Sequence, residues 1–327
     1  MNEMKNYESM TVQEQWTILA TVANLYYNSE LTQSQIADRM YTSRSKVSRM
    51  LKKARELGIV EIYIREPRER NLDFEQRLKK EFSLTNIRVI ATRNSSEDGG
   101  FQKIAEAASY YFDSIVKPDM VVGISWGNTL HRIIKNIDTN NRKNIPITVV
   151  PIMGAANIKS PEKDAMELAK NLASAYGGKY HYIYAPLFVR DRSLKESLIQ
   201  EQNIRKVLDL SEHSDVILTS VGSIVYKSWS DYLSAKTLEA LTEQGAVGHI
   251  GGHFYDIRGN ELETALVERM IGITLDDIRK CPEVICVAYG ESKADAILGA
   301  LRGGFLNTLI TDENCASKIL GLSKKMS

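Results

Sequence analysis

Residues 31–64 read LTQSQIADRMYTSRSKVSRMLKKARELGIVEIYI, and this stretch decides the fold of the amino-terminal part of the chain. Thr32 and Gln35 have the spacing of a capping box, which predicts that a helix begins here. Ser43 precedes a second helical pattern in the same way, and Gly58 would end that helix. The alternating residues after Gly58 are typical of a strand. Two short helices, a turn and a strand predict a winged helix-turn-helix.

The flanking positions complete this predicted domain. Apolar residues at helical spacing between Gln13 and Tyr27 indicate a supporting helix behind the other two. Tyr41 occupies a turn position that usually carries Gly in such motifs, because the backbone there favours positive φ. We therefore expect a turn that is wider than the usual one.

From the end of the first predicted helix through most of the second, every charged residue is basic. From Arg39 to Arg55 seven residues are basic and none is acidic, although the whole chain has 42 basic and 41 acidic residues. The net charge is only +1, so nucleic-acid binding has to come from such a local patch. A solvated helix face is the simpler alternative, but it does not account for the capped helix pair with its turn and wing. Operator DNA is the expected partner, and the expected contacts are Thr32, Gln33, Ser43, Arg44, Ser45, Lys46, Ser48, Arg49, Lys52 and Lys53.

These side chains have different expected roles at the DNA. Arg44 and Arg49 can each present two donors to a guanine, which reads sequence. Lys52 and Lys53 suit phosphate contacts, which add affinity without sequence information. A winged helix that binds protein instead of DNA is the alternative, and the binding of random duplex at low salt distinguishes the two.

Length and composition limit the remaining classes. A chain of 327 residues, with 43% hydrophobic and 25% charged residues, is ordinary globular material for about two domains. Cys281, Cys286 and Cys315 lack CxxC spacing, which argues against a disulfide framework or a zinc site and fits a reducing cytoplasm. The polar amino terminus is unlike a signal peptide, and no apolar run approaches the roughly 20 residues that span a bilayer. We expect a cytoplasmic protein with no membrane segment.

The pattern divides the chain into three parts. Residues 1–66 form the predicted DNA-binding domain, and residues 67–84 a linker helix that either pairs subunits or packs on its own second domain. In residues 85–327, apolar strand-like runs alternate with helical patterns. This alternation predicts an α/β fold with a doubly wound parallel sheet and helices on both faces. Ligands of such sheets bind beyond the carboxyl ends of the strands.

One loop at such a strand end is the most informative. It reads GISWGNT, and backbone amides at the helix start that follows suit a phosphate group. The same letters satisfy G-x-S-x-G, the nucleophile elbow of α/β-hydrolases. A hydrolase would need Asp215 with His249 or His253, which only their order in the chain supports. The candidate ligand residues of the loop are Gly123, Ser125, Trp126, Gly127, Asn128 and Thr129.

Other predicted strand ends supply further candidates. Lys293 begins a helix, where the helix dipole disfavours a lysine unless an anion is near, and both a phosphate contact and a solvated lysine stay open. His249, His253 and Asp256 suggest a metal, but no further ligand is in view, so we expect neither metal nor cofactor. The remaining candidates end hydrophobic strands with small or polar residues, and they are Met153, Gly154, Gly222 and Ser223.

Five separated segments, 25–40, 43–60, 123–130, 245–261 and 289–312, together form a pattern more specific than a helix-turn-helix alone. With this pattern the chain resembles the SorC family of sugar-responsive bacterial transcriptional regulators over essentially its whole length, including the deoxyribonucleoside and central glycolytic regulators. The resemblance implies an effector domain similar to sugar-phosphate isomerases and deaminases that binds instead of catalysing. It implies a repressor or activator of a carbohydrate-utilisation operon, a phosphorylated sugar or polyol as effector, and a dimer or tetramer.

Carried over by position, the resemblance gives roles to the candidate residues. It implies that Ser125, Gly127 and Thr129 hold the phosphate with help from Lys293. It also implies that the sugar end is bordered by Gly222, Ser223 and Asp256. An enzyme, either a serine hydrolase or a sugar-phosphate isomerase using the GISWG loop, is the alternative function.

Two positions depart from the family pattern. Met153 stands where deoxyribonucleoside regulators of the family carry a lysine that forms a Schiff base, so we expect non-covalent binding. His249 stands in GAVGH where many relatives read GAVGD. We expect this change to alter the preferred hydroxyl pattern or charge of the ligand, with a histidine that titrates near neutral pH.

Overall fold

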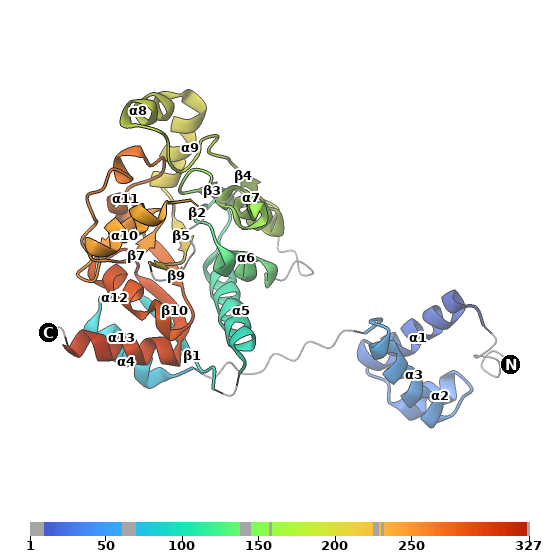
Figure 1. Cartoon of the computed structure of the whole chain (residues 1–327). Coiled ribbons are helices and arrows are strands. Elements are labelled where there is room, and N and C mark those ends of the chain that lie inside the picture. The colour runs from blue at the N-terminus through green and yellow to red at the C-terminus, as the bar shows by residue number, and fades with distance from the viewer. Residues whose placement is uncertain are drawn as a thin grey trace. The chain divides into compact units, whose positions relative to one another are not determined.

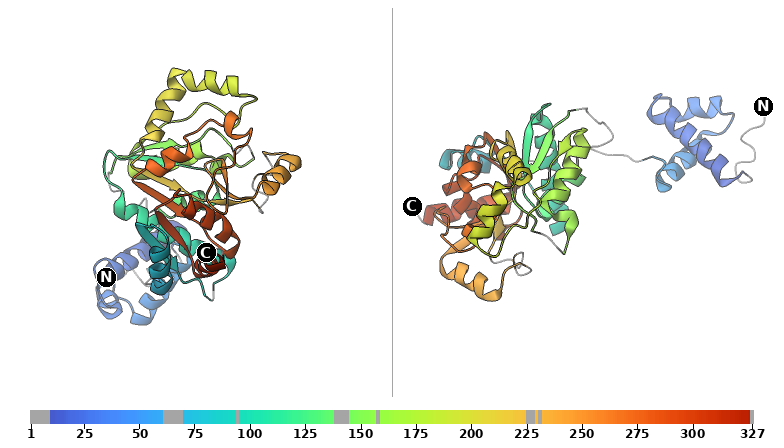
Figure 2. Two further views of the ribbon diagram at one scale, coloured as in Figure 1. Left: turned by 90° about the vertical axis from the view of Figure 1, so that its left-hand side faces the viewer. Right: turned by 90° about the horizontal axis from the view of Figure 1, so that it is seen from above.

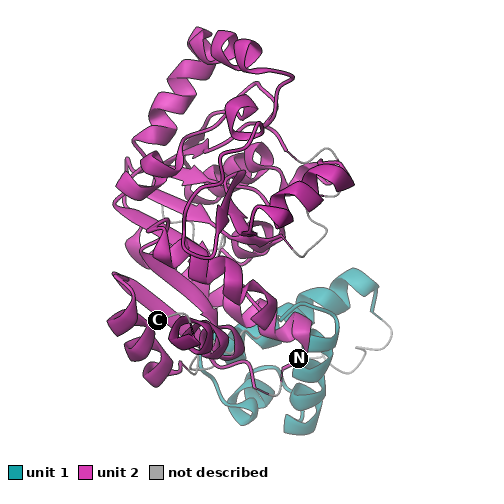
Figure 3. Ribbon diagram, turned by 60° about the vertical axis from the view of Figure 1, so that its left-hand side comes forward, with its two compact units in different colours: residues 1–67 teal, residues 68–327 magenta. Residues whose placement is uncertain are grey.

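The computed structural model of the chain describes residues 10–60, 70–93, 95–137, 145–156, 159–224, 229 and 232–325. Two compact units, residues 1–67 and 68–327, are coloured separately in Figure 3. Most of the strand expected at residues 59–64 lies outside the described residues, and with it the wing. No helix in the described ranges is long and apolar enough to cross a membrane.

The described residues of the first unit form three helices, which make up the predicted helix-turn-helix (Figure 1). They are α1 (Val12–Tyr27), α2 (Gln33–Arg39) and α3 (Arg44–Glu56). Thr32 and Gln35 make both hydrogen bonds of the predicted capping box, and the Ser43 hydroxyl accepts from the Lys46 amide. The three helices bury a common apolar core that includes Leu19, Val22, Ile36, Ala37, Val47, Met50, Leu51 and Ala54.

The turn between α2 and α3 is not wider than usual, so that expectation was wrong. Tyr41 itself adopts the left-handed conformation, with a φ of 49°. The Thr42 amide donates to the carbonyl of Ala37 at 2.9 Å, which is the bond of a Schellman helix end. Tyrosine therefore takes the conformation that glycine would take here, and its ring is 82% exposed.

The second unit is built on a seven-stranded sheet whose neighbouring strands are all parallel, as the alternating pattern predicted. From the middle of the sheet, β2, β3 and β4 follow one another toward one edge. In the other direction, β5, β9 and β10 follow one another, and β1 lies outside β10 at that edge. The order of the strands therefore reverses between β2 and β5, which is the switch point of the sheet. In spatial order the strands are β1 (Asn86–Ile90), β10 (Thr308–Asp312), β9 (Glu283–Val287), β5 (Val216–Thr219), β2 (Val121–Ile124), β3 (Thr148–Pro151) and β4 (Lys179–Tyr180).

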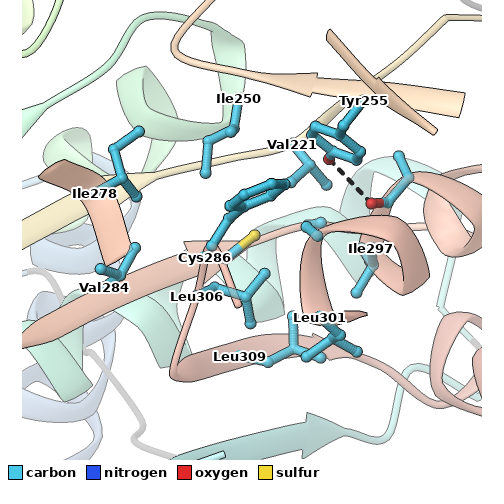
Figure 4. Close-up of a cluster of buried hydrophobic side chains, with 14 of the residues drawn as sticks. Val221, Ile250, Tyr255, Ile278, Val284, Cys286, Ile297, Leu301, Leu306 and Leu309 are labelled. Carbon is cyan, nitrogen blue, oxygen red and sulfur yellow. Dashed lines mark hydrogen bonds between the residues drawn. The ribbon is translucent and has the colours of Figure 1, made fainter. Parts of the chain in front are cut away.

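Helices cover both faces of this sheet (Figure 1 and Figure 2), because successive strand residues point to opposite faces and both sets are apolar. In β5, Val216 and Leu218 pack with the helices α5 (Glu97–Ile115), α6 (Asn128–Lys135) and α7 (Ala165–Tyr176). Ile217 points to the other face, which carries α4 (Leu72–Glu81), α9 (Gln202–Glu212), α12 (Ala294–Arg302) and α13 (Glu313–Lys325). Figure 4 shows part of that second core, where Cys286 lies among aliphatic side chains.

A second, antiparallel sheet packs beside α12. Its strands are β6 (Gly222–Ser223), β7 (Ala246–Ile250) and β8 (His253–Asp256). The alternating pattern had indicated strands of the parallel series in this part of the chain as well, but residues 246–256 form an antiparallel hairpin instead. Gly251 and Gly252 have φ values of 57° and 98°, so the chain reverses there in a tight hairpin whose two turn positions both need the positive φ that glycine adopts without strain.

The expected linker helix is α4, and it packs on its own unit. Leu78 is fully buried in the second core, and the side-chain Nδ2 of Asn71 donates to the Glu313 carboxylate on α13 at 2.9 Å. The unit also contains the helices α8 (Arg192–Gln200), α10 (Ala235–Glu243) and α11 (Leu275–Lys280).

Candidate functional site

The ends of the two strands at the switch point are joined by a pair of hydroxyl side chains. Ser125, directly after β2, and Thr219, the last residue of β5, lie 3.0 Å apart through their Oγ atoms. The Ser125 amide also donates to the Leu218 carbonyl at 3.3 Å. Thr219 was not predicted, and its position at the end of an apolar run was the only signal for it. This pair fixes the predicted loop at the position where parallel sheets bind ligands.

The loop then leads into an open helix end. Gly127 has a φ of 123°, which side-chain-bearing residues rarely adopt, and its amide donates to the Lys163 carbonyl at 2.9 Å. No side chain caps α6, whose first amides belong to Asn128 and Thr129. Asn128 is exposed and Thr129 half-buried. The amides and the helix dipole favour a negatively charged group at this end.

Three other candidates have packing roles. A Cβ atom on Gly123 would lie 2.8 Å from a side-chain carbon of Ile152, so this glycine lets another side chain fill the space beside β2. Met153 is fully buried in the core. A Cβ atom on Gly154 would lie 2.6 Å from the carbonyl oxygen of Pro186. Their contacts are with the protein interior.

His249, Gly222 and Lys293 come together beside the switch point. Gly222 pairs with His249 across β6 and β7, and a Cβ atom on Gly222 would lie 1.7 Å from the histidine Nε2. Ser223 follows in β6 and is buried. Lys293 ends a short helical turn after β9, and burial lowers its pKa.

The expectation that His249 titrates near neutral pH was wrong. Burial, and secondly the charge of Lys293, lower the pKa of His249 to about 3. The imidazole is therefore neutral at physiological pH, with one donor and one acceptor nitrogen.

Asp256 lies away from these residues. Its carboxylate accepts hydrogen bonds from the amides of Arg258 and Asn260, each at 2.9 Å, and from the Asn260 side chain. These contacts hold the turn after β8, and β8 pairs Asp256 with Ala246 at the far end of β7 from His249. Asp256 therefore stabilises this turn.

The residues nominated for a hydrolase do not assemble. Asp215 precedes β5 and accepts from the amide of Val121, at the opposite end of the strands from Ser125. Both ring nitrogens of His253 are bonded, to Glu261 and to the carbonyl of Ile273. The metal hypothesis also lacks a ligand set, since no group of three or more His, Cys, Asp or Glu within the described ranges is suited to hold an ion.

In the first unit, α3 separates its residues as predicted. Its buried face carries Val47, Met50, Leu51 and Ala54. The exposed face carries Arg44, Ser45, Ser48, Arg49, Lys52 and Lys53, while Lys46 is half-buried. Thr32 and Ser43 serve as helix caps, and Gln33 begins α2. Lys52 lies 3.8 Å from Glu56, an exposed pair that is weak enough to be exchanged for another partner.

Comparison with known proteins agrees with both units. A family model described as "Putative sugar-binding domain" matches residues 66–321, and a MarR family model matches residues 9–70. The sorbitol operon regulator of Klebsiella pneumoniae is 27% identical over 307 residues, 93% of this chain and 97% of the relative. The crystal structure of that full-length regulator, SorC, superposes with a TM-score of 0.82 and covers 93% of this chain and 98% of that one. The chain belongs to the sugar-binding domain family, among the SorC-type transcriptional regulators.

Other SorC-type proteins match over nearly the whole chain. The deoxyribonucleoside regulator of Bacillus subtilis is 28% identical and covers 91% of this chain and 95% of its own length. The regulator LsrR of Escherichia coli is 29% identical and covers 92% and 94%. These relatives are transcriptional regulators and not enzymes, which confirms the non-enzymatic interpretation.

Proposed function

We propose that this protein controls a carbohydrate-utilisation operon, with α3 on operator DNA and a phosphorylated sugar or polyol bound non-covalently at the ends of β2 and β5. The observation that carries the proposal is the bond between Ser125 and Thr219, which holds an uncapped helix start at the switch point of the sheet. An anion bound at α6 would gain from the free amides and from the donors of Asn128 and Thr129.

Control of DNA binding requires the effector to distinguish two states of the protein. In an oligomer, effector binding would favour one spacing of the DNA-binding units. Half-sites about one helical turn apart, or a multiple of that, are expected for a symmetric dimer. The effect on DNA affinity cannot exceed the difference in effector affinity between the two states, typically about 1–3 kcal/mol.

A thermal-shift screen of the full chain tests the effector. The panel contains phosphorylated sugars and polyols, each with its unphosphorylated counterpart. A ligand at 100 times its dissociation constant should stabilise the second unit by about 2.7 kcal/mol. Thr129→Val should weaken the binding of the best phosphorylated ligand about tenfold, since a hydrogen bond to a charged group is lost.

The matched control is Thr148→Val, the same change at the opposite end of the sheet, which should leave affinity unchanged. If no phosphorylated compound bound better than its unphosphorylated counterpart, the proposed site at α6 would be excluded.

A further inference from the structure

An aromatic cluster, centred on Trp229, adjoins the switch point. The side chain of Trp229 is only 1% exposed. Its ring centroid lies 4.9 Å from that of His249 and 5.5 Å from that of Trp126, which directly follows Ser125. The other rings against Trp229 are those of Phe188, Tyr232 and Phe254. These residues come from separate segments, so no local sequence pattern indicated the cluster.

Three buried nitrogen atoms in this cluster have no hydrogen-bond partner among the described residues. They are Nε1 of Trp229 and both Nδ1 and Nε2 of His249. Buried polar atoms in folded proteins are almost always paired. His253 shows the usual situation, because both its ring nitrogens are bonded. Unpaired nitrogens that gather beside a strand-end site indicate a bound group as their partner.

His249 lies beside the site at the ends of β2 and β5. Its Nε2 lies against Gly222, which leaves room for the ring only because it has no Cβ atom. Gly222 comes three residues after Thr219, the partner of Ser125. The imidazole therefore lies along the segment that continues directly from the switch point.

The three nitrogens define what kind of group they can pair. Neutral His249 offers one donor and one acceptor, and the Trp229 indole offers one donor. A hydroxyl group both donates and accepts, so it can pair with either ring nitrogen or with the indole, and two neighbouring hydroxyls of a polyol can satisfy all three nitrogens. A carboxylate only accepts and would leave the imidazole acceptor unpaired. An ammonium group only donates and would leave the imidazole donor and the indole donor unpaired.

We propose that Trp229 and His249 bind the end of the effector opposite its phosphate and select an uncharged hydroxyl there. This inference rests on the proposed function and adds the residues that decide specificity. The ligand class is then a phosphorylated polyol or sugar with a neutral, hydroxylated far end. Phosphorylated sugar acids of the same chain length are rejected.

Two probes of equal length test the selection: sorbitol 6-phosphate, which ends in a hydroxymethyl group, and 6-phosphogluconate, which ends in a carboxylate. Calorimetric titration of the full chain should give at least tenfold tighter binding of the polyol phosphate. His249→Leu removes both ring nitrogens at similar volume and should reduce this ratio to below threefold. Trp229→Phe should weaken both probes to a similar degree, because a donor can serve either oxygen.

Two control variants separate selection from packing and from phosphate binding. Phe188→Leu alters the same cluster without removing a polar atom and should keep the wild-type ratio. Thr129→Val should weaken both probes equally and also keep the ratio. Near-ultraviolet circular dichroism checks that each variant is folded.

The outcomes separate the two hypotheses. Binding of both probes with a ratio that His249→Leu does not change, or that Phe188→Leu changes as much, overturns the specificity role and leaves the proposed function intact. Preference of the wild type for the acid overturns it as well. If neither these probes nor any phosphorylated compound of the screen binds, the proposed function fails, and the inference fails with it.

Discussion

Two residues of this protein adopt a backbone conformation or a protonation state that their residue type alone would not predict. Tyr41 adopts a positive φ that costs a non-glycine residue about 1–2 kcal/mol, and the rest of the helix-turn-helix supports it. His249 is held neutral by burial, although an exposed histidine titrates near pH 6.5. In both residues the surrounding packing, and not the intrinsic preference, sets the state.

The depressed pKa of His249 predicts how stability depends on pH. In the unfolded chain this histidine takes up a proton as the pH falls below its ordinary value of 6.5, but in the folded protein only near 3. Its contribution to stability is therefore fully present above pH 6.5 and is lost progressively as the pH falls toward 3. Between pH 7 and pH 5 the loss from this one group should be about 2 kcal/mol.

Urea unfolding of the second unit at pH 7 and pH 5 measures this difference. His249→Leu should lose about 2 kcal/mol less than the wild type over that interval. His213→Leu, at an exposed position, should respond to pH as the wild type does. Equal losses for the wild type and His249→Leu would contradict a neutral buried imidazole.

At the scale of elements, α3 has an apolar face that packs in the core of the first unit and an exposed basic face on the opposite side. Its apolar face is fixed by contacts with α1 and α2, so the exposed face is held as a rigid surface. The caps at Thr32 and Ser43 fix where both helices begin, and these caps set which basic residues point outward. Substitutions on the exposed face should therefore change DNA binding with little effect on folding.

Arg44→Ala and Lys53→Ala should affect DNA binding differently. The loss of Arg44 should cost about 1–3 kcal/mol on a selected operator and relax the sequence preference. The loss of Lys53 should weaken all sequences alike and reduce the slope of affinity against salt by about one. Fluorescence anisotropy measures both, with a duplex selected by the full chain and a random duplex. Equal losses on both duplexes for both variants would show that the base-reading role is misassigned.

At the scale of the whole molecule, the helix-turn-helix and the sugar-binding domain lie in different compact units, so any communication between the two proposed sites is a coupling free energy. If the effector changes operator affinity by some factor, operator DNA must change effector affinity by the same factor. A coupling of about 1–3 kcal/mol corresponds to roughly 5- to 150-fold.

Two titrations of the full chain test this reciprocity. The first measures the affinity for operator DNA with and without the best ligand of the screen. The second measures the affinity for that ligand with and without operator DNA. The two factors should agree, and residues 68–327 alone should bind the ligand with no response to DNA. An effector that leaves operator affinity unchanged would exclude the ligand-controlled mechanism.

Local features could be predicted from the sequence. The capping box of Thr32 and Gln35, the cap at Ser43 and the helix end at Gly58 depend on residues a few positions apart. The parallel sheet was predictable as well, because its strands are buried on both faces and read as short apolar runs between helical patterns. The basic face of α3 also follows from spacing alone.

The site itself was decided only by the tertiary structure. The bond from Ser125 to Thr219 joins residues 94 positions apart, and the contact of Trp229 with His249 joins two further segments. Gly123 and Met153 lie at predicted strand ends just as Ser125 does, yet their contacts are with the protein interior. Short-range patterns determine which elements form, because caps and periodicity act between neighbours. Long-range packing determines which side chains meet and which polar atoms stay unpaired, and no local pattern contains that information.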